Sequence, residues 1–146
     1  PDAMHWIDLG SGGGFPGMVI AILLQDRPGA RVELVESNRK KTAFLQAVKA
    51  QCAPSAHIHP ARIEDVVGRI APPEIVTARA RAGLPKLLEM TAPWLQGDTR
   101  ALFHKGRGYA AEIEESRAKW GFDLVVHESR IDADSVVLDI TNLRPA

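Results

Sequence analysis

Residues 6–17 read WIDLGSGGGFPG and join a short apolar segment to a glycine-rich turn and a proline. The apolar residues 6–9 predict a buried strand, and the glycines after it permit a tight turn that a Cβ atom would obstruct. Pro16 stands where a helix would begin, because its fixed φ and missing N–H suit the first helical position. A strand, a bare-backbone turn and a helix N-terminus present N–H groups beside a positive dipole end. We therefore expect a small polar or anionic ligand at this turn.

The composition is that of an ordinary globular domain. Of the 146 residues, 45% are hydrophobic and 25% are charged, and the 18 basic residues balance the 18 acidic ones. A zero net charge directs no global field at nucleic acid or membrane, so any basic surface must be local. The single cysteine, Cys52, excludes an internal disulfide, which suits a reducing cytoplasm, and no apolar stretch is long enough to span a bilayer. We expect one domain over residues 1–146 and a cytoplasmic location.

Strand-like and helix-like segments alternate along the chain. Strands are predicted over 6–9, 31–36, 57–59, 75–78, 99–104, 122–127 and 136–140, and helices over 16–25, 39–51, 63–70, 85–91 and 109–120. Asn38 is expected to cap the helix over 39–51, and Glu112 to point outward from the helix over 109–120. This alternation predicts an α/β fold, a doubly wound and mostly parallel seven-stranded sheet with helices on both faces. Only a turn joins the last two strands, so they are expected to form a terminal antiparallel pair at one sheet edge.

Two cofactors compete for the glycine turn. The spacing of Gly12, Gly14 and Gly17 matches the dinucleotide fingerprint of NAD(P) oxidoreductases, and Glu36 stands where a ribose-binding acid is expected. A carboxylate at that place could equally accept hydrogen bonds from the ribose of another nucleoside cofactor. No Gly-Lys-Ser/Thr follows the turn, so a P-loop is excluded.

The alternative pattern resembles motif I of class I S-adenosylmethionine (SAM) methyltransferases. It consists of Gly10, Gly12 and Gly14 with Asp8 just ahead of them. In that motif the turn contacts the amino-acid part of the cofactor, and the acid helps to hold the ammonium group. Asp8 and the closing strand pair favour SAM over NAD(P).

The order of five sequence blocks is similar to that of the RsmG (GidB) family of bacterial methyltransferases. The blocks are DLGSGGGFPG (8–17), VESNRKKTAFL (35–45), ARIED (61–65), TARA (77–80) and KG (105–106). The resemblance implies a class I methyltransferase (Rossmann-like) fold, SAM as cofactor, and methylation of N7 of a guanine in 16S ribosomal RNA. It implies the small ribosomal subunit or its precursor as partner, without membrane or metal. Family members also carry N-terminal helices, and we expect that residues 1–146 do not include them.

The resemblance and the class I pattern together predict the cofactor contacts. These are Asp8, Gly10, Gly12, Gly14, Phe15, Glu36, Ile63, Glu64 and Arg79. After the third strand, a backbone N–H can read an adenine ring nitrogen, and the carboxylate of Glu64 or Asp65 can accept from the 6-amino group. A plain alternative is that these acids only favour the dipole of a helix start.

Arg79 and Lys105 are the predicted catalytic residues. Guanine N7 has an unprotonated lone pair, so methylation needs alignment rather than a general base. Arg79 is expected just past the fourth strand, where its planar fork could bind a phosphate or the guanine O6/N7 edge. A set of basic residues after strands is expected to form a phosphate-facing rim around the cofactor site: Arg39, Lys40, Lys41, Arg79, Arg81, Lys86, Lys105 and Arg107. The competing interpretation is a set of solvated or ion-paired surface cations.

The other reactive residue types give weaker signals of function. Cys52 follows the second helix, away from the strand ends, and is interpreted as an inert packed thiol. His57 and His59 are interpreted as strand surface rather than metal ligands. The chain departs from the family at ARAR (78–81), at Glu74 and at His104. A non-catalytic SAM-binding module that docks on RNA remains the other alternative.

Overall fold

The computed structural model describes residues 3–10, 16–79, 83–129 and 133–146. The strands are β1 His5–Leu9, β2 Arg31–Val35, β3 Ala56–His59, β4 Ile75–Arg79, β5 Arg100–Lys105, β6 Trp120–Glu128 and β7 Val136–Pro145. The helices are α1 Gly17–Leu23, α2 Arg39–Cys52, α3 Ile63–Val66, α4 Leu84–Leu95 and α5 Tyr109–Arg117.

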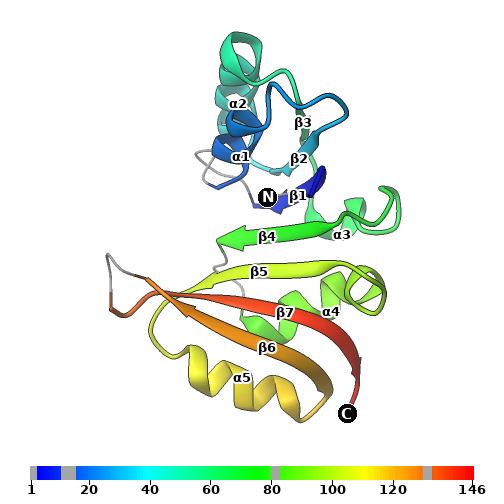
Figure 1. Cartoon of the computed structure of the whole chain (residues 1–146), viewed down its shortest axis with the longest axis vertical. Coiled ribbons are helices and arrows are strands. Elements are labelled where there is room, and N and C mark those ends of the chain that lie inside the picture. The colour runs from blue at the N-terminus through cyan, green and yellow to red at the C-terminus, as the bar shows by residue number, and fades with distance from the viewer. Residues whose placement is uncertain (1–2, 11–15, 80–82, 130–132) are drawn as a thin grey trace.

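The strands form one sheet in the order β3-β2-β1-β4-β5-β7-β6 (Figure 1). The ladders from β3 to β5 are parallel, and β7 runs antiparallel to both β5 and β6. The predicted mixed sheet with its terminal antiparallel pair is therefore confirmed. The strand order reverses between β1 and β4, and in open α/β sheets ligands bind at the carboxyl edge beside such a reversal.

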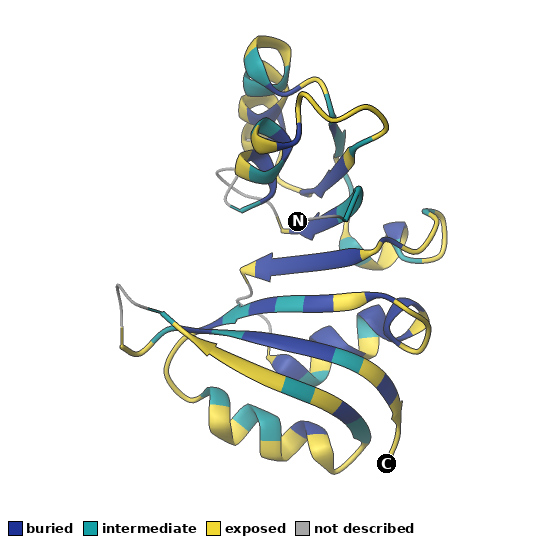
Figure 2. Ribbon diagram, viewed as in Figure 1, coloured by how far each residue is buried: buried dark blue, intermediate teal, exposed yellow. Residues whose placement is uncertain are grey.

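Helices cover both faces of the sheet. On one face, Met18 and Ala21 of α1 and Leu45 of α2 pack against Val32 and Leu34 of β2. The larger core lies on the other face, under α3, α4 and α5 (Figures 1 and 2). Its fully buried members include Ile7, Val76, Phe103, Leu88 and Leu138. Successive residues of a strand point to opposite faces, so β2 places Val32 and Leu34 in one core and Val35 in the other.

Burial decides where several helices end. The helix expected over 85–91 continues to Leu95 through an exposed Pro93, because Trp94 and Leu95 are 2% and 0% exposed. Burying these two side chains contributes several kcal/mol, which offsets the cost of about 3 kcal/mol for an internal proline. The helix expected over 63–70 ends at Val66, and Gly68 follows with a φ of +113°.

The remaining boundaries differ by a few residues. The first helix spans Gly17–Leu23 rather than 16–25, and the last spans Tyr109–Arg117, so that Trp120 begins β6. The predicted cap of α2 is confirmed, because the Asn38 side chain accepts a hydrogen bond from the Lys41 N–H at 3.1 Å. None of the helices that the structure describes is long and apolar enough to cross a bilayer.

Candidate functional site

The carboxyl ends of β1, β2 and β4 meet at one edge of the sheet (Figure 1). Gly10 follows β1 with a φ of +67°, and its N–H donates to the Val35 carbonyl at the end of β2 over 2.8 Å. A positive φ favours glycine, so the residue type matches the start of the turn. Gly12, Gly14 and Phe15 lie outside the described residues.

Asp8 joins three elements beneath this edge. Its carboxylate is 1% exposed; Oδ1 accepts from the Thr77 hydroxyl of β4 at 2.7 Å, and Oδ2 accepts from the Gly17 N–H of α1 at 3.2 Å. A Cβ atom on Gly17 would lie 2.5 Å from Oδ2, so only glycine fits there. Both hydrogen bonds join Asp8 to other parts of this chain, namely β4 and α1. Binding of a cofactor ammonium by Asp8 stays a prediction.

Thr77 was not among the predicted site residues. It is 3% exposed and lies directly beside Asp8 in the parallel register of β1 and β4. The sequence signal was a lone hydroxyl in the apolar strand run IVTA (75–78), next to a strand that carries a carboxylate. A buried polar group needs a partner, and these two residues supply each other's.

The ends of β2 and β3 place the remaining cofactor candidates. Glu36 follows β2 with 9% exposure, and its Oε2 accepts from the Asn38 N–H at 2.9 Å, directly before α2. Ile63 begins α3 and packs partly against the larger core, whereas Glu64 and Asp65 are exposed in the first turn. These residues follow β2 and β3 as predicted. Cofactor binding by these residues stays a prediction.

Arg79 is the last residue of β4 rather than the residue after it. Its side chain is exposed, and His104 of β5 is its register neighbour on the same face of the sheet. Partial burial lowers the pKa of His104, and the nearby positive charge of Arg79 lowers it further. The carboxyl edge beyond β4 and β5 therefore presents a guanidinium beside an imidazole that is neutral at pH 7.

Lys105 does not face an open phosphate-binding rim. It is 8% exposed, and its Nζ forms an ion pair with Glu112 of α5 at 2.8 Å. Strand alternation puts it on the opposite face from His104 and Arg79. The same Glu112 oxygen accepts from the Leu84 N–H at the start of α4 over 2.8 Å. Glu112 was expected to point outward, and it instead ties α5 to β5 and α4.

The other predicted rim residues are mostly exposed. They are Arg39, Lys40 and Lys41 at the start of α2, Lys86 in α4, and Arg107, which forms an exposed ion pair with Asp134 at 2.8 Å. Arg81 lies outside the described residues.

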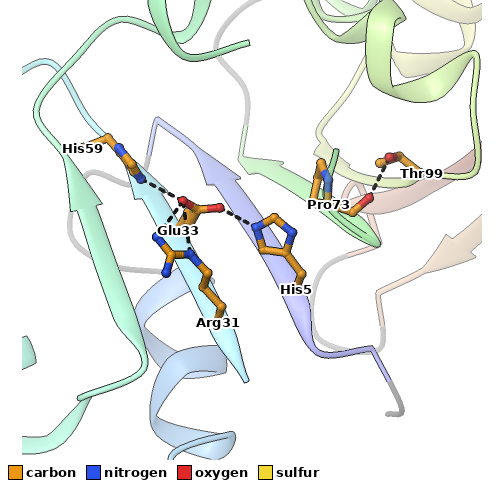
Figure 3. Close-up of polar contacts among 6 residues, drawn as sticks. All are labelled: His5, Arg31, Glu33, His59, Pro73 and Thr99. Atoms are coloured by element: carbon orange, nitrogen blue, oxygen red, sulfur yellow. Dashed lines mark hydrogen bonds and ion pairs between the residues drawn. The ribbon is translucent and has the colours of Figure 1, made fainter. Parts of the chain in front are cut away.

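A second polar cluster lies on β1–β3 (Figure 3). Glu33 is 2% exposed and accepts hydrogen bonds from His5 and, at 3.0 Å, from His59, with Arg31 at 3.5 Å. Desolvation pushes the pKa of Glu33 up, but the two imidazole hydrogen bonds and nearby positive charge outweigh it, so the pKa is lowered. His59 was interpreted as strand surface, and it proves to be half-buried and bonded.

With this geometry in view, comparison with known proteins decides the family. A family model described as rRNA small subunit methyltransferase G (GidB) matches residues 1–135. The chain belongs to the GidB family. The family resemblance and its SAM-dependent methyltransferase activity are thus confirmed, and the NAD(P) oxidoreductase alternative is wrong.

Curated GidB-family relatives are similar over almost the whole chain. Ribosomal RNA small subunit methyltransferase G of Chelativorans sp. strain BNC1 is 56% identical over 144 residues, which cover 99% of this chain and 69% of the relative. The protein of the same name from Brucella anthropi is 51% identical over 143 residues, which cover 98% and 67%. The chain thus spans about two thirds of the length of these two relatives.

Solved structures show the same fold at low sequence identity. Aeropyrum pernix fibrillarin, crystallised with natively bound S-adenosyl-L-methionine, superposes with a TM-score of 0.70 at 14% identity. The match covers 95% of this chain and 66% of that one. The class I methyltransferase fold predicted for the GidB-family chain is confirmed.

The described carboxyl edge fits SAM chemically. The Asn38 N–H holds the Glu36 carboxylate in place. A carboxylate fixed in this way can accept hydrogen bonds from both hydroxyls of a ribose. Gly17 lies so close to Asp8 that no side chain separates the start of α1 from β1. Exposed carboxylates at the start of α3 can accept from an adenine amino group.

Proposed function

We propose that the chain methylates N7 of a guanine in 16S ribosomal RNA, in the small subunit or its precursor, in the bacterial cytoplasm. GidB membership supports methyl transfer to small-subunit rRNA. The observation that carries the choice of N7 is the exposed Arg79 beside the neutral His104 at the tips of β4 and β5. A guanidinium matches the two acceptors of the guanine Hoogsteen edge, O6 and N7. N7 carries no proton, so neither residue has to act as a base.

The cofactor-binding residues act by holding and orienting. Glu36 accepts from the ribose hydroxyls, the Ile63 backbone reads the adenine ring, and Glu64 or Asp65 accepts from its amino group. Gly10, Gly12, Gly14 and Phe15 supply the turn against the amino-acid portion, with Asp8 beneath it. Bound SAM supplies an electrophilic methyl group on a sulfonium. The chain's own task is to exclude water and align the guanine N7 with that methyl.

Arg79 contacts the substrate, whereas Lys105 acts through another residue. The Arg79 fork binds guanine O6 or an adjacent phosphate and fixes the plane of the base. Arg79 also borders the cofactor from the end of β4, where its contact adds little to SAM affinity beside those of Glu36 and the glycine turn. Lys105 positions α4 through Glu112, which holds the first turn of that helix. The exposed cations at 39–41, Lys86 and Arg107 contact phosphates and add a salt-dependent share of the affinity.

The test is methyl incorporation into undermethylated small ribosomal subunits, compared with naked RNA, with the product nucleosides identified by mass spectrometry. We expect 7-methylguanosine. Incorporation at another atom, or SAM binding in calorimetry without any incorporation, contradicts the proposal, and the second result favours the non-catalytic binding module.

The Arg79→Ala variant separates substrate binding from cofactor binding. We expect kcat/KM for the RNA to fall about 100-fold, since a bidentate base contact is worth about 1–3 kcal/mol and its loss also misaligns N7. The affinity for SAM should change less than about three-fold, because Glu36 and the glycine turn remain. Arg27→Ala, an exposed arginine in the turn after α1, is the matched control. Normal methylation by Arg79→Ala would exclude the role.

A further inference from the structure

A buried chain of hydrogen bonds connects β4, β1 and α1 below the cofactor edge. The Thr77 hydroxyl donates to Asp8 Oδ1 at 2.7 Å, and the Gly17 N–H donates to Asp8 Oδ2 at 3.2 Å. Both Thr77 and Asp8 are at most 3% exposed. Thr77 is 69 residues from Asp8 in the sequence and meets it because β1 and β4 pair in parallel register.

The packing around this chain leaves little freedom. A Cβ atom on Gly17 would lie 2.5 Å from Oδ2 and 2.7 Å from Cβ of Asp8, so α1 begins in direct contact with the carboxylate. The start of α1 therefore leaves the Asp8 side chain no room to rotate toward the helix. At 2.7 Å, the hydroxyl and the carboxylate oxygen are at the ordinary distance of a well-formed O–H···O hydrogen bond. Thr77 therefore limits where the carboxylate can lie, and the carboxylate limits where α1 can start.

We propose that Thr77 is a positioning residue for SAM binding. It holds Asp8, Asp8 holds the first N–H of α1, and the start of α1 is the point at which the glycine turn ends. Thr77 itself lies under the edge and acts through Asp8 rather than by touching the cofactor. The inference rests on the proposed function only in taking SAM as the ligand of this edge.

Two substitutions distinguish the hydroxyl from the shape of the side chain. Thr77→Val keeps the volume and removes the donor, whereas Thr77→Ser keeps the donor. We expect the Kd for SAM, measured by calorimetry, to rise about ten-fold in Thr77→Val and less than about two-fold in Thr77→Ser. The KM for SAM should rise in parallel, while kcat at saturating SAM stays within about two-fold.

Thr99→Val is the matched control. Thr99 is another buried threonine, directly before β5, and its hydroxyl donates to the Pro73 carbonyl at 2.6 Å at the amino edge of the sheet (Figure 3). Its loss should lower stability by a similar amount and leave the Kd for SAM unchanged. An equal loss of SAM affinity in Thr99→Val would show a general effect of stability and overturn the proposal.

A double-mutant cycle with Asp8→Asn tests the route of action. If Thr77 acts through Asp8, the Kd of the double variant for SAM should be about equal to the higher of the two single-variant Kd values. Additive losses, or an unchanged Kd in folded Thr77→Val, overturn the proposal. Should the valine variant not fold, Thr77→Cys, whose thiol is a weak donor, must give a Kd between those of wild type and Asp8→Asn, and a wild-type Kd would overturn it.

Failure of this inference and failure of the proposed function give different results. If wild-type chain binds SAM but forms no 7-methylguanosine, the proposed function fails while the binding experiments still decide the role of Thr77. If 7-methylguanosine forms and Thr77→Val binds SAM as wild type does, only the positioning role fails. Wild-type chain that does not bind SAM overturns both.

Discussion

Replacing Glu33 by glutamine should destabilise the fold in a pH-dependent way. Glu33 lies in the middle of three parallel strands, and its carboxylate bonds to the imidazoles of His5 on β1 and His59 on β3 (Figure 3). Glutamine keeps the size but removes the charge. One oxygen acceptor is also replaced by an NH2 group, which points at an imidazole.

The expected loss at pH 7 is about 1–2 kcal/mol. A hydrogen bond to a charged group contributes about 1.5–3 kcal/mol and a neutral one about 0.5–1.5 kcal/mol, and two such bonds are weakened. Release of the desolvation cost of the carboxylate offsets part of this. The lowered pKa of Glu33 nevertheless means that the fold favours the charged form, so the net effect must be destabilising.

The sign of the pH dependence follows from the same shift. Because the pKa of Glu33 is lowered in the folded state, its contribution is fully present above its usual value of 4.5. The contribution is lost as the pH falls through the lower, folded-state pKa. The gap in unfolding free energy between wild type and Glu33→Gln should therefore be largest near neutrality and shrink below pH 4.5.

Urea unfolding followed by tryptophan fluorescence measures both effects, since Trp94 is 2% exposed in the native state. Glu115→Gln, an exposed glutamate on α5, is the matched control and should change the unfolding free energy by less than about 0.5 kcal/mol. If Glu33→Gln were as stable as wild type at pH 7, or if its deficit were the same at pH 4, the reasoning would be refuted.

Three further substitutions test the carboxyl edge. Gly17→Ala forces a Cβ to within 2.5 Å of Asp8 and should cost about 1–3 kcal/mol of unfolding free energy, measured by thermal denaturation; wild-type stability would contradict the geometry. Glu36→Gln should weaken SAM binding about ten-fold in calorimetry, because an amide accepts at one oxygen only, and an unchanged Kd would remove Glu36 from the site. Lys105→Met should destabilise the fold by about 1–3 kcal/mol, because it leaves Glu112 without its ion-pair partner. It should not change the slope of RNA affinity against salt concentration, whereas a slope smaller by about one would show a phosphate contact.

Local sequence patterns determined the architecture. The alternation of apolar segments and helical segments predicted the doubly wound sheet, and the missing helix between the last two strands predicted the antiparallel pair β6–β7. Asn38 predicted a helix cap, which the structure confirms. These features depend on residues close together in the chain, so they can be predicted without knowledge of the fold. The blocks that resemble the GidB family are likewise contiguous.

Element ends were less accessible, because they depend on distant partners. The helix expected over 85–91 continues to Leu95, because burial of Trp94 and Leu95 under the sheet carries it two residues past Pro93. The short α3 ends at Val66, although the helix was expected to continue to Ile70. Propensity is a weak term, and tertiary packing outweighs it at such positions.

The sequence by itself determined that a glycine turn follows a central strand and that acids and cations follow the other strands. Only the tertiary structure decided which of them meet. Strand register places Thr77 beside Asp8, and strand alternation turns Lys105 away from Arg79 toward Glu112. The physical reason is that one residue of register or one step along a strand moves a side chain to the opposite face. The start of α1 at Gly17 thus acquires, through Asp8, a support from β4 that no local pattern contains.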